Sequence, residues 1–127
     1  MNDENTKRLF DKYPSLYADH TRSPMESLMC FGFECGDGWY AIIDALSATV
    51  AQVSPECRAV QVKEKFGTLR FYTATSDSAV DAAVQMAGEM SARTCEECGS
   101  TKGASTRGLR KGWLRTLCRE CENRRGE

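Results

Sequence analysis

The feature of this sequence that most constrains its fold is a pair of Cys-x-x-Cys motifs in the last third of the chain. CEEC spans residues 95–98 and CREC spans residues 118–121, with 19 residues between them. Zn²⁺ in structural sites takes four protein ligands in a tetrahedron, and a two-residue gap lets one tight turn supply two thiolates. The spacing therefore predicts a structural zinc site whose ligands are Cys95, Cys98, Cys118 and Cys121.

The count of seven cysteines in 127 residues also fits the disulfides of a secreted chain. However, the first residues, MNDENTKRLF, lack the basic and then apolar layout of a secretion signal. No apolar run approaches the ~18 residues of a transmembrane helix. We therefore expect a cytoplasmic protein without a membrane partner, in which the paired cysteines bind metal. Redox-active or merely buried cysteines are the alternative.

Residues 93–127 are predicted to form a small zinc-finger module. Gly99 follows the first cysteine pair and suits a turn that needs positive φ. A short hairpin through residues 105–117 and a helix at the second pair would give the order of a treble-clef finger, with a zinc ribbon as the alternative. The metal should supply much of the folding energy, because few apolar residues are available for a core. These are Leu109, Trp113, Leu114 and Leu117.

The charge differs between the two parts of the chain. Residues 1–92 hold 8 basic and 13 acidic side chains, a net charge of -5, whereas residues 93–127 hold 9 and 5, a net charge of +4. Such a basic module either has a solvated charged face or binds phosphates, with an aromatic side chain stacked on a base. The candidate nucleic-acid contacts are Arg107, Arg110, Lys111, Trp113 and Arg115.

Residues 1–92 are predicted to form an α+β domain. Apolar spacing indicates helices over residues 3–13, 38–53 and 77–92, and alternation indicates a β-hairpin over residues 59–74. A type II′ turn at Gly67 and Thr68 would pair Phe66 with Leu69 and Lys65 with Arg70.

The predicted hairpin has one apolar face, which includes the unexplained acid Glu64, and one basic face. The stretch ECGDGWY, residues 34–40, comes directly before the second predicted helix, where Asp37 would be the N-cap and Glu34 would face the basic hairpin. A candidate binding surface therefore includes Glu34, Asp37, Trp39, Lys63, Lys65, Arg70 and Tyr72.

Three blocks of the sequence resemble those of a family of small uncharacterised proteins from bacteriophages and prophages. They are MCFGFECGDGWY, VQVKEKFGTLRFY, and CEECG with GWLRTLC, which together span most of the chain. The resemblance implies a phage or prophage origin, hence the host cytoplasm as location, and a zinc-binding C-terminal part, but no established activity. Family members often end the ligand set with Cys and then His, whereas this chain has Cys118 and Cys121, which can equally ligate zinc.

Three classes of function are compatible with these features. The first is a zinc-binding phage or prophage accessory protein that binds a macromolecule, such as a host defence protein. The second is a nucleic-acid-binding zinc finger. The third is an enzyme or a trap for an anionic small molecule that uses the basic hairpin face. No catalytic constellation favours an enzyme, because His20 is the only histidine and Glu34, Asp37 and Glu64 follow no spacing rule. We expect a protein partner.

Overall fold

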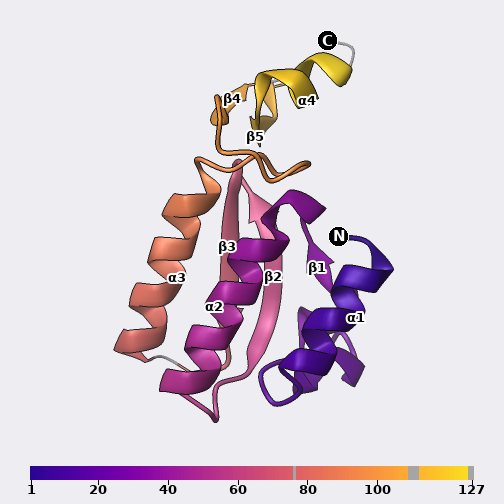
Figure 1. The fold of residues 1–127 in the computed structure, drawn as a ribbon. Coiled ribbons are helices and arrows are strands. Elements are labelled where there is room, and N and C mark those ends of the chain that lie inside the picture. Colours follow the sequence, from indigo (N-terminus) through magenta and orange to yellow (C-terminus); the bar gives the residue numbers. More distant parts are fainter. Residues whose placement is uncertain (76, 109–111, 126–127) are drawn as a thin grey trace.

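The computed structural model describes residues 1–75, 77–108 and 112–125. Its architecture is mixed α+β, as the sequence predicts (Figure 1). The α-helices are α1 (Asp3–Lys12), α2 (Tyr40–Val53), α3 (Ser78–Ser91) and α4 (Arg119–Arg124). The strands are β1 (Phe33–Glu34), β2 (Ala59–Lys65), β3 (Thr68–Thr73), β4 (Ser105–Gly108) and β5 (Leu114–Leu117). Short 3-10 helices are η1 (Ala18–Thr21), η2 (Leu28–Phe31) and η3 (Asp37–Trp39).

The larger part of the molecule is a three-stranded sheet covered on one face by helices. The strand order is β1-β2-β3, with β1 parallel and β3 antiparallel to β2. Helices α2 and α3 lie side by side on one face of the sheet, and α1 lies beside β1 (Figure 1). The apolar stripes that predict these helices face the core, where the largest fully buried side chains include Leu9, Tyr17, Trp39, Ile43 and Val50.

The β2–β3 hairpin differs from its predicted register. Its turn residues are Phe66 and Gly67, both with positive φ, at 55° and 85°. This is the condition for a type I′ turn and not for the predicted type II′ turn at Gly67 and Thr68. Leu69 consequently pairs with Glu64 and not with Phe66. Because this shift along β2 is two residues, the basic side chains still share one face, and the turn exposes Phe66.

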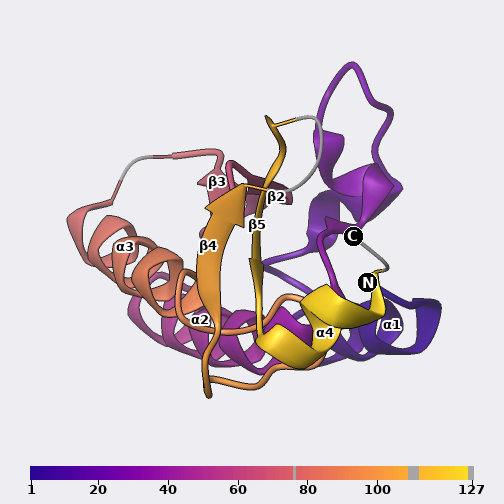
Figure 2. The ribbon, with the colours of Figure 1, turned by 90° about the horizontal axis from the view of Figure 1, so that it is seen from above.

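The four-cysteine part of the chain lies at one end of the layered part, above the ends of α2, α3 and the sheet (Figure 1). Strands β4 and β5 pair antiparallel and form a separate two-stranded sheet. Figure 2, viewed from this end, shows the β4–β5 hairpin and α4 lying across the layer of helices and strands. In the described part of the chain, no helix combines the length and the apolarity needed to cross a membrane.

Candidate metal centre

The four predicted cysteine ligands lie together in the structure. Their Sγ atoms are all within 4.8 Å of one another. The Sγ atoms of Cys98 and Cys118 are 3.7 Å apart. Four sulfurs at ~2.3 Å from one ion would be separated by ~3.8 Å in a tetrahedron. The cluster can therefore hold a metal ion through four thiolates.

The first ligand pair is supplied by a tight turn. Gly99 has a φ of +81°, which is the conformation expected of a glycine after the second cysteine. The Gly99 amide donates to the Cys95 carbonyl at 2.9 Å, and the Cys95 amide donates to the Ser100 carbonyl at 2.8 Å. The turn buries Cys95 and leaves Cys98 exposed.

The second ligand pair lies at the start of α4. Cys118 is the N-cap of this helix, and its Sγ accepts from the Cys121 amide at 3.5 Å. Arg124 Nη2 donates to Cys121 Sγ at 3.4 Å. A helix N-terminus and a guanidinium both favour negative charge on sulfur. The order of turn, hairpin and ligand-bearing helix follows the sequence expectation.

The thiols of the cluster differ in how readily they ionise. Burial disfavours the thiolate of Cys95, but hydrogen bonds from the backbones of Cys118, Cys98 and Glu97 outweigh burial and lower its pKa to about 7. The pKa of Cys121 is raised by burial and by the neighbouring thiols of Cys118, Cys98 and Cys95. A metal ion needs all four thiolates, so binding must release protons, and metal affinity should rise with pH.

The other cysteines lie outside this cluster. Cys35 and Cys57 are buried in the main core, whereas Cys30 is half-buried. Burial raises the pKa of Cys35 to about 12 and also raises the pKa of Cys57. Buried neutral thiols behave as small apolar side chains.

The metal module has almost no apolar core of its own. The buried cluster consists of Leu117 and three of the cysteines, with Ala104 packed against it. Trp113 and Leu114, which the sequence offers as core residues, are 67% and 40% exposed. Leu109 lies outside the described residues. The fold of this module therefore depends on the metal and on contacts with the rest of the chain.

The ECGDGWY stretch provides the main contact with the first metal-binding turn. The Gly38 amide donates to the Glu96 carbonyl at 2.7 Å, and the Gly36 amide donates to Glu96 Oε2 at 2.9 Å. A Cβ added at Gly38 would lie 2.1 Å from the Cys95 carbonyl oxygen, and one at Gly36 would lie 2.4 Å from the Glu96 carbonyl oxygen. Both glycines are required because the turn approaches their backbone so closely. We call Gly36 and Gly38 the glycine cradle.

Two residues of this stretch have roles that differ from those predicted. Trp39 is fully buried, with its Nε1 donating to the Thr94 carbonyl at 2.9 Å, so it is not part of a surface. Asp37 does not cap α2, because α2 continues from η3, whose N-cap is Gly36. The Asp37 carboxylate instead accepts from the Asn2 amide at 2.9 Å and from the Asn5 side chain at 3.1 Å.

A second contact joins the metal module to the β2–β3 hairpin. Thr116 Oγ1 donates to the Gly67 carbonyl at 2.6 Å. Arg115 lies 2.9 Å from the Glu96 carboxylate and 3.8 Å from that of Glu64. Glu64 also accepts from the Gly67 amide at 2.8 Å. The position of Glu64 on the apolar hairpin face is thus explained by its ion pair with Arg115.

We expect Arg115→Met to lower the free energy of unfolding by about 2 kcal/mol, because it leaves the carboxylate of Glu96, only 5% exposed, without its cation. The matched control is Arg8→Met, whose ion pair with Glu4 is exposed and should contribute less than ~0.5 kcal/mol. Chemical denaturation of both metal-loaded variants measures the difference. Equal stabilities would show that the Arg115 pair does not hold the module in place.

The predicted nucleic-acid contacts are not grouped as a free basic surface among the described residues. Arg107 pairs with Glu122 at 2.7 Å and also donates to the Gly103 carbonyl at 3.1 Å. Arg115 is engaged as described above. Arg110 and Lys111 lie outside the described residues. Trp113 is exposed. Stacking on a base would require this exposure, but so would contact with any other partner.

The rest of the predicted binding surface lies on the open face of the sheet. Lys63, Lys65, Arg70 and Tyr72 alternate with the buried residues of β2 and β3 and so point away from α2 and α3. Glu34 is the register partner of Lys63 across β1 and β2. Its Oε1 accepts from Gln61 Nε2 at 3.4 Å.

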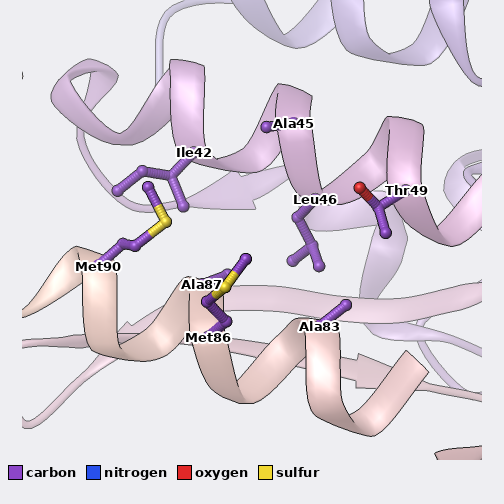
Figure 3. A pocket seen from close by; sticks show the side chains of 8 residues that line it. All are labelled: Ile42, Ala45, Leu46, Thr49, Ala83, Met86, Ala87 and Met90. Atoms are coloured by element: carbon purple, nitrogen blue, oxygen red, sulfur yellow. The ribbon is translucent and has the colours of Figure 1, made fainter. Parts of the chain in front are cut away.

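The lone histidine packs against an aromatic ring, and the groove between α2 and α3 is small. His20 stacks on Phe10, with ring centroids 4.3 Å apart. The groove between α2 and α3 is closed by apolar side chains that point toward one another, including Ile42, Leu46 and Met90 (Figure 3). Its volume of about 70 Å³ is far below the ~300 Å³ of a small-molecule site. The groove therefore belongs to helix packing.

In comparisons with protein-family models, curated proteins and solved structures, no match to this chain was found. The phage resemblance therefore stays a prediction from the sequence blocks alone.

Proposed function

We propose that the four-cysteine cluster binds Zn²⁺ as a structural ion in a treble-clef finger. Four thiolates are the soft ligand set that zinc takes in closed structural sites, and they leave no open position for water or substrate. Support comes from the sulfur geometry and from a second ligand pair that begins a helix. In this account the zinc builds and holds a surface and takes no part in a reaction.

We propose further that the protein acts by binding a protein partner. The observation that supports this is an exposed apolar group formed where the hairpin meets the metal module. Phe66 is 64% exposed, Trp113 is 67% exposed and Leu114 is 40% exposed. These side chains line one open hollow together with Glu64 and Arg115. We call Phe66, Trp113 and Leu114 the aromatic surface.

The composition of the aromatic surface suits a protein partner. Tryptophan and other aromatic side chains are enriched in the energetically dominant centres of protein interfaces. The Glu64–Arg115 pair at the base of the hollow leaves little free charge for a phosphate backbone. The expected occupant is an apolar side chain of the partner, surrounded by polar contacts. The phage resemblance suggests that the partner is a host protein, such as a defence component.

A comparison of two single variants tests the proposal. Trp113→Ala should leave the stability within ~0.5 kcal/mol, because the side chain is mostly exposed, but should remove binding of the partner. The matched control is Met86→Ala, which removes another large apolar side chain, 64% exposed, from a different face. Quantitative capture of host proteins by zinc-loaded wild type and both variants provides the measurement. A partner retained equally by all three proteins would contradict the proposed surface.

A further inference from the structure

The open face of the three-stranded sheet carries cations that have no acidic partners. Lys63 lies directly opposite Arg70 in the β2–β3 pairing, and Lys65 is on the same face two residues along β2. Within the described residues, none of these three cations forms an ion pair with a carboxylate. Like charges directly opposite each other on a sheet repel. Such an arrangement is expected where an anion compensates it.

Arg70 differs from the other arginines of the described chain. Those that pair with carboxylates are Arg8, Arg22, Arg58, Arg93, Arg107, Arg115, Arg124 and Arg125. Only Arg70 and Arg119 have no such pair among the described residues. Arg119 is exposed at the start of α4, whereas Arg70 is half-buried.

The Arg70 guanidinium also has an unsatisfied donor. Its Nε is buried and has no hydrogen-bond acceptor in the described part of the chain. Asp19 and Arg107 also have a buried side-chain atom without a hydrogen-bond partner, but both groups have ionic partners. Buried donors are normally satisfied by protein, water or a bound ion. Arg70 is the one of these groups that has neither a hydrogen bond nor an ionic partner.

The acid opposite Lys63 on β1 does not neutralise this face. Glu34 is the register partner of Lys63, but its carboxylate hydrogen-bonds Gln61 and forms no ion pair among the described residues. The row Glu34, Lys63, Arg70 therefore has one negative and two positive charges, with Lys65 adding a third positive charge on the same face. The N-terminal part as a whole is acidic, so this local excess of positive charge is opposite in sign to the net charge of that part.

We infer that Arg70 and Lys63 bind the oxyanion of a phosphate group on the open face of the sheet. The planar guanidinium can donate two parallel hydrogen bonds to phosphate oxygens, and the lysine ammonium supplies a compact charge beside it. Lys65 adds attraction, and Tyr72 lies on the same face beside Arg70. The phosphate belongs either to a small phosphorylated compound or to the backbone of a single-stranded nucleic acid. Arg70 and Lys63 are not part of the aromatic surface, whereas the Lys65 ammonium lies 5.5 Å from the centroid of the Phe66 ring. The site does not depend on the proposed protein partner.

Nuclear magnetic resonance of the arginine Nε–H groups tests this site directly. The ¹⁵N-labelled, zinc-loaded protein would be titrated with inorganic phosphate, pyrophosphate and a twelve-residue oligothymidylate, with NaCl holding the ionic strength constant. We expect the Arg70 Nε–H resonance to shift saturably. Saturation by phosphate or pyrophosphate alone identifies a small compound, whereas much tighter binding of the oligonucleotide, with a steep salt dependence, identifies a nucleic-acid backbone.

Variants distinguish a specific phosphate-binding site from general electrostatic attraction. Arg70→Ala and Lys63→Ala should each weaken binding about tenfold or more, because each removes a charge-assisted hydrogen bond. Arg119→Ala removes the other arginine that has no ion pair among the described residues and should leave the affinity unchanged. Arg70→Lys keeps the charge and the fold but loses the two-pronged contact, so it should also weaken binding. The inference is overturned if no titrant shifts Arg70, or if Arg119→Ala and Arg70→Ala weaken binding equally.

Discussion

Removal of the metal is expected to unfold the metal module, of which the structure describes residues 94–108 and 112–125, and to lower the stability of the whole chain. Structural zinc contributes on the order of 10 kcal/mol of apparent folding energy to small metal modules, and among the described residues of this module the buried cluster holds only Leu117 and three of the ligands. Hydrogen exchange before and after addition of a strong chelator should show loss of protection at the Glu96 amide, which donates to the Thr116 carbonyl in the folded protein. Zinc added back should restore it.

The same unfolding should be visible at Trp39. Its Nε1 donates to Thr94 at the start of the module, and its side chain is fully buried. Chelation should therefore shift its fluorescence to longer wavelength, whereas Trp113 is already exposed and should change little. Cys118→Ser should behave like the chelated protein, and Cys30→Ser, which alters a cysteine outside the cluster, should behave like wild type. A module that keeps its protection without metal would contradict this account.

Gly38→Ala is expected to lower the free energy of unfolding by about 3 kcal/mol or more. The new Cβ would lie 2.1 Å from the Cys95 carbonyl oxygen and 2.6 Å from the carbonyl carbon and oxygen of Glu96, so the backbone must move. The displaced turn carries Cys95, so the variant should also release metal faster to a chromophoric chelator. Thermal unfolding and the rate of metal transfer provide two independent readouts.

Gly108→Ala is the matched control for this substitution. Gly108 lies in β4 of the metal module, and an added Cβ there would meet no atom of the described residues within 4 Å. The stability and metal release of this variant should stay close to those of wild type. If both alanine variants behaved alike, the glycine cradle would not be the element that holds the metal-binding turn.

The metal centre could be predicted because short-range spacing in the sequence marks all four of its ligands. Two cysteine pairs with two-residue gaps specify four thiolates without reference to the rest of the fold, and Gly99 marks the turn between Cys98 and Ser100. The three long helices follow for the same reason, since each apolar stripe is visible within one segment. Both inferences need only the sequence spacing of a few residues.

The contacts around the metal centre were not predictable in the same way. Gly36 and Gly38 are required by a turn sixty residues further along the chain. Nothing in the ECGDGWY stretch itself indicates which segment will pack against it. Glu64 on an apolar strand face was a signal of an ion pair, but its partner Arg115 could be found only from the fold. Trp39 directly precedes α2 and continues the apolar stripe of that helix, which was a sufficient reason to place it in the core.

The observed hairpin register depends on a turn whose backbone conformation is uncommon for the residues that form it. Phe66 adopts positive φ, which is unfavourable for a bulky residue and is offset here by contacts of the turn with the metal module. The predicted faces nevertheless stand, because a shift of two residues preserves them. The unpaired cations of the open face therefore follow from the sequence, whereas the direct juxtaposition of Lys63 and Arg70 needed the structure.

The most direct test of the central claim is the metal content of the intact chain, measured by native mass spectrometry and elemental analysis. This account predicts one zinc ion per chain in the wild type and in Cys30→Ser, and none in Cys118→Ser. A wild-type chain without zinc, or one whose mass shows disulfides among Cys95, Cys98, Cys118 and Cys121, would contradict it.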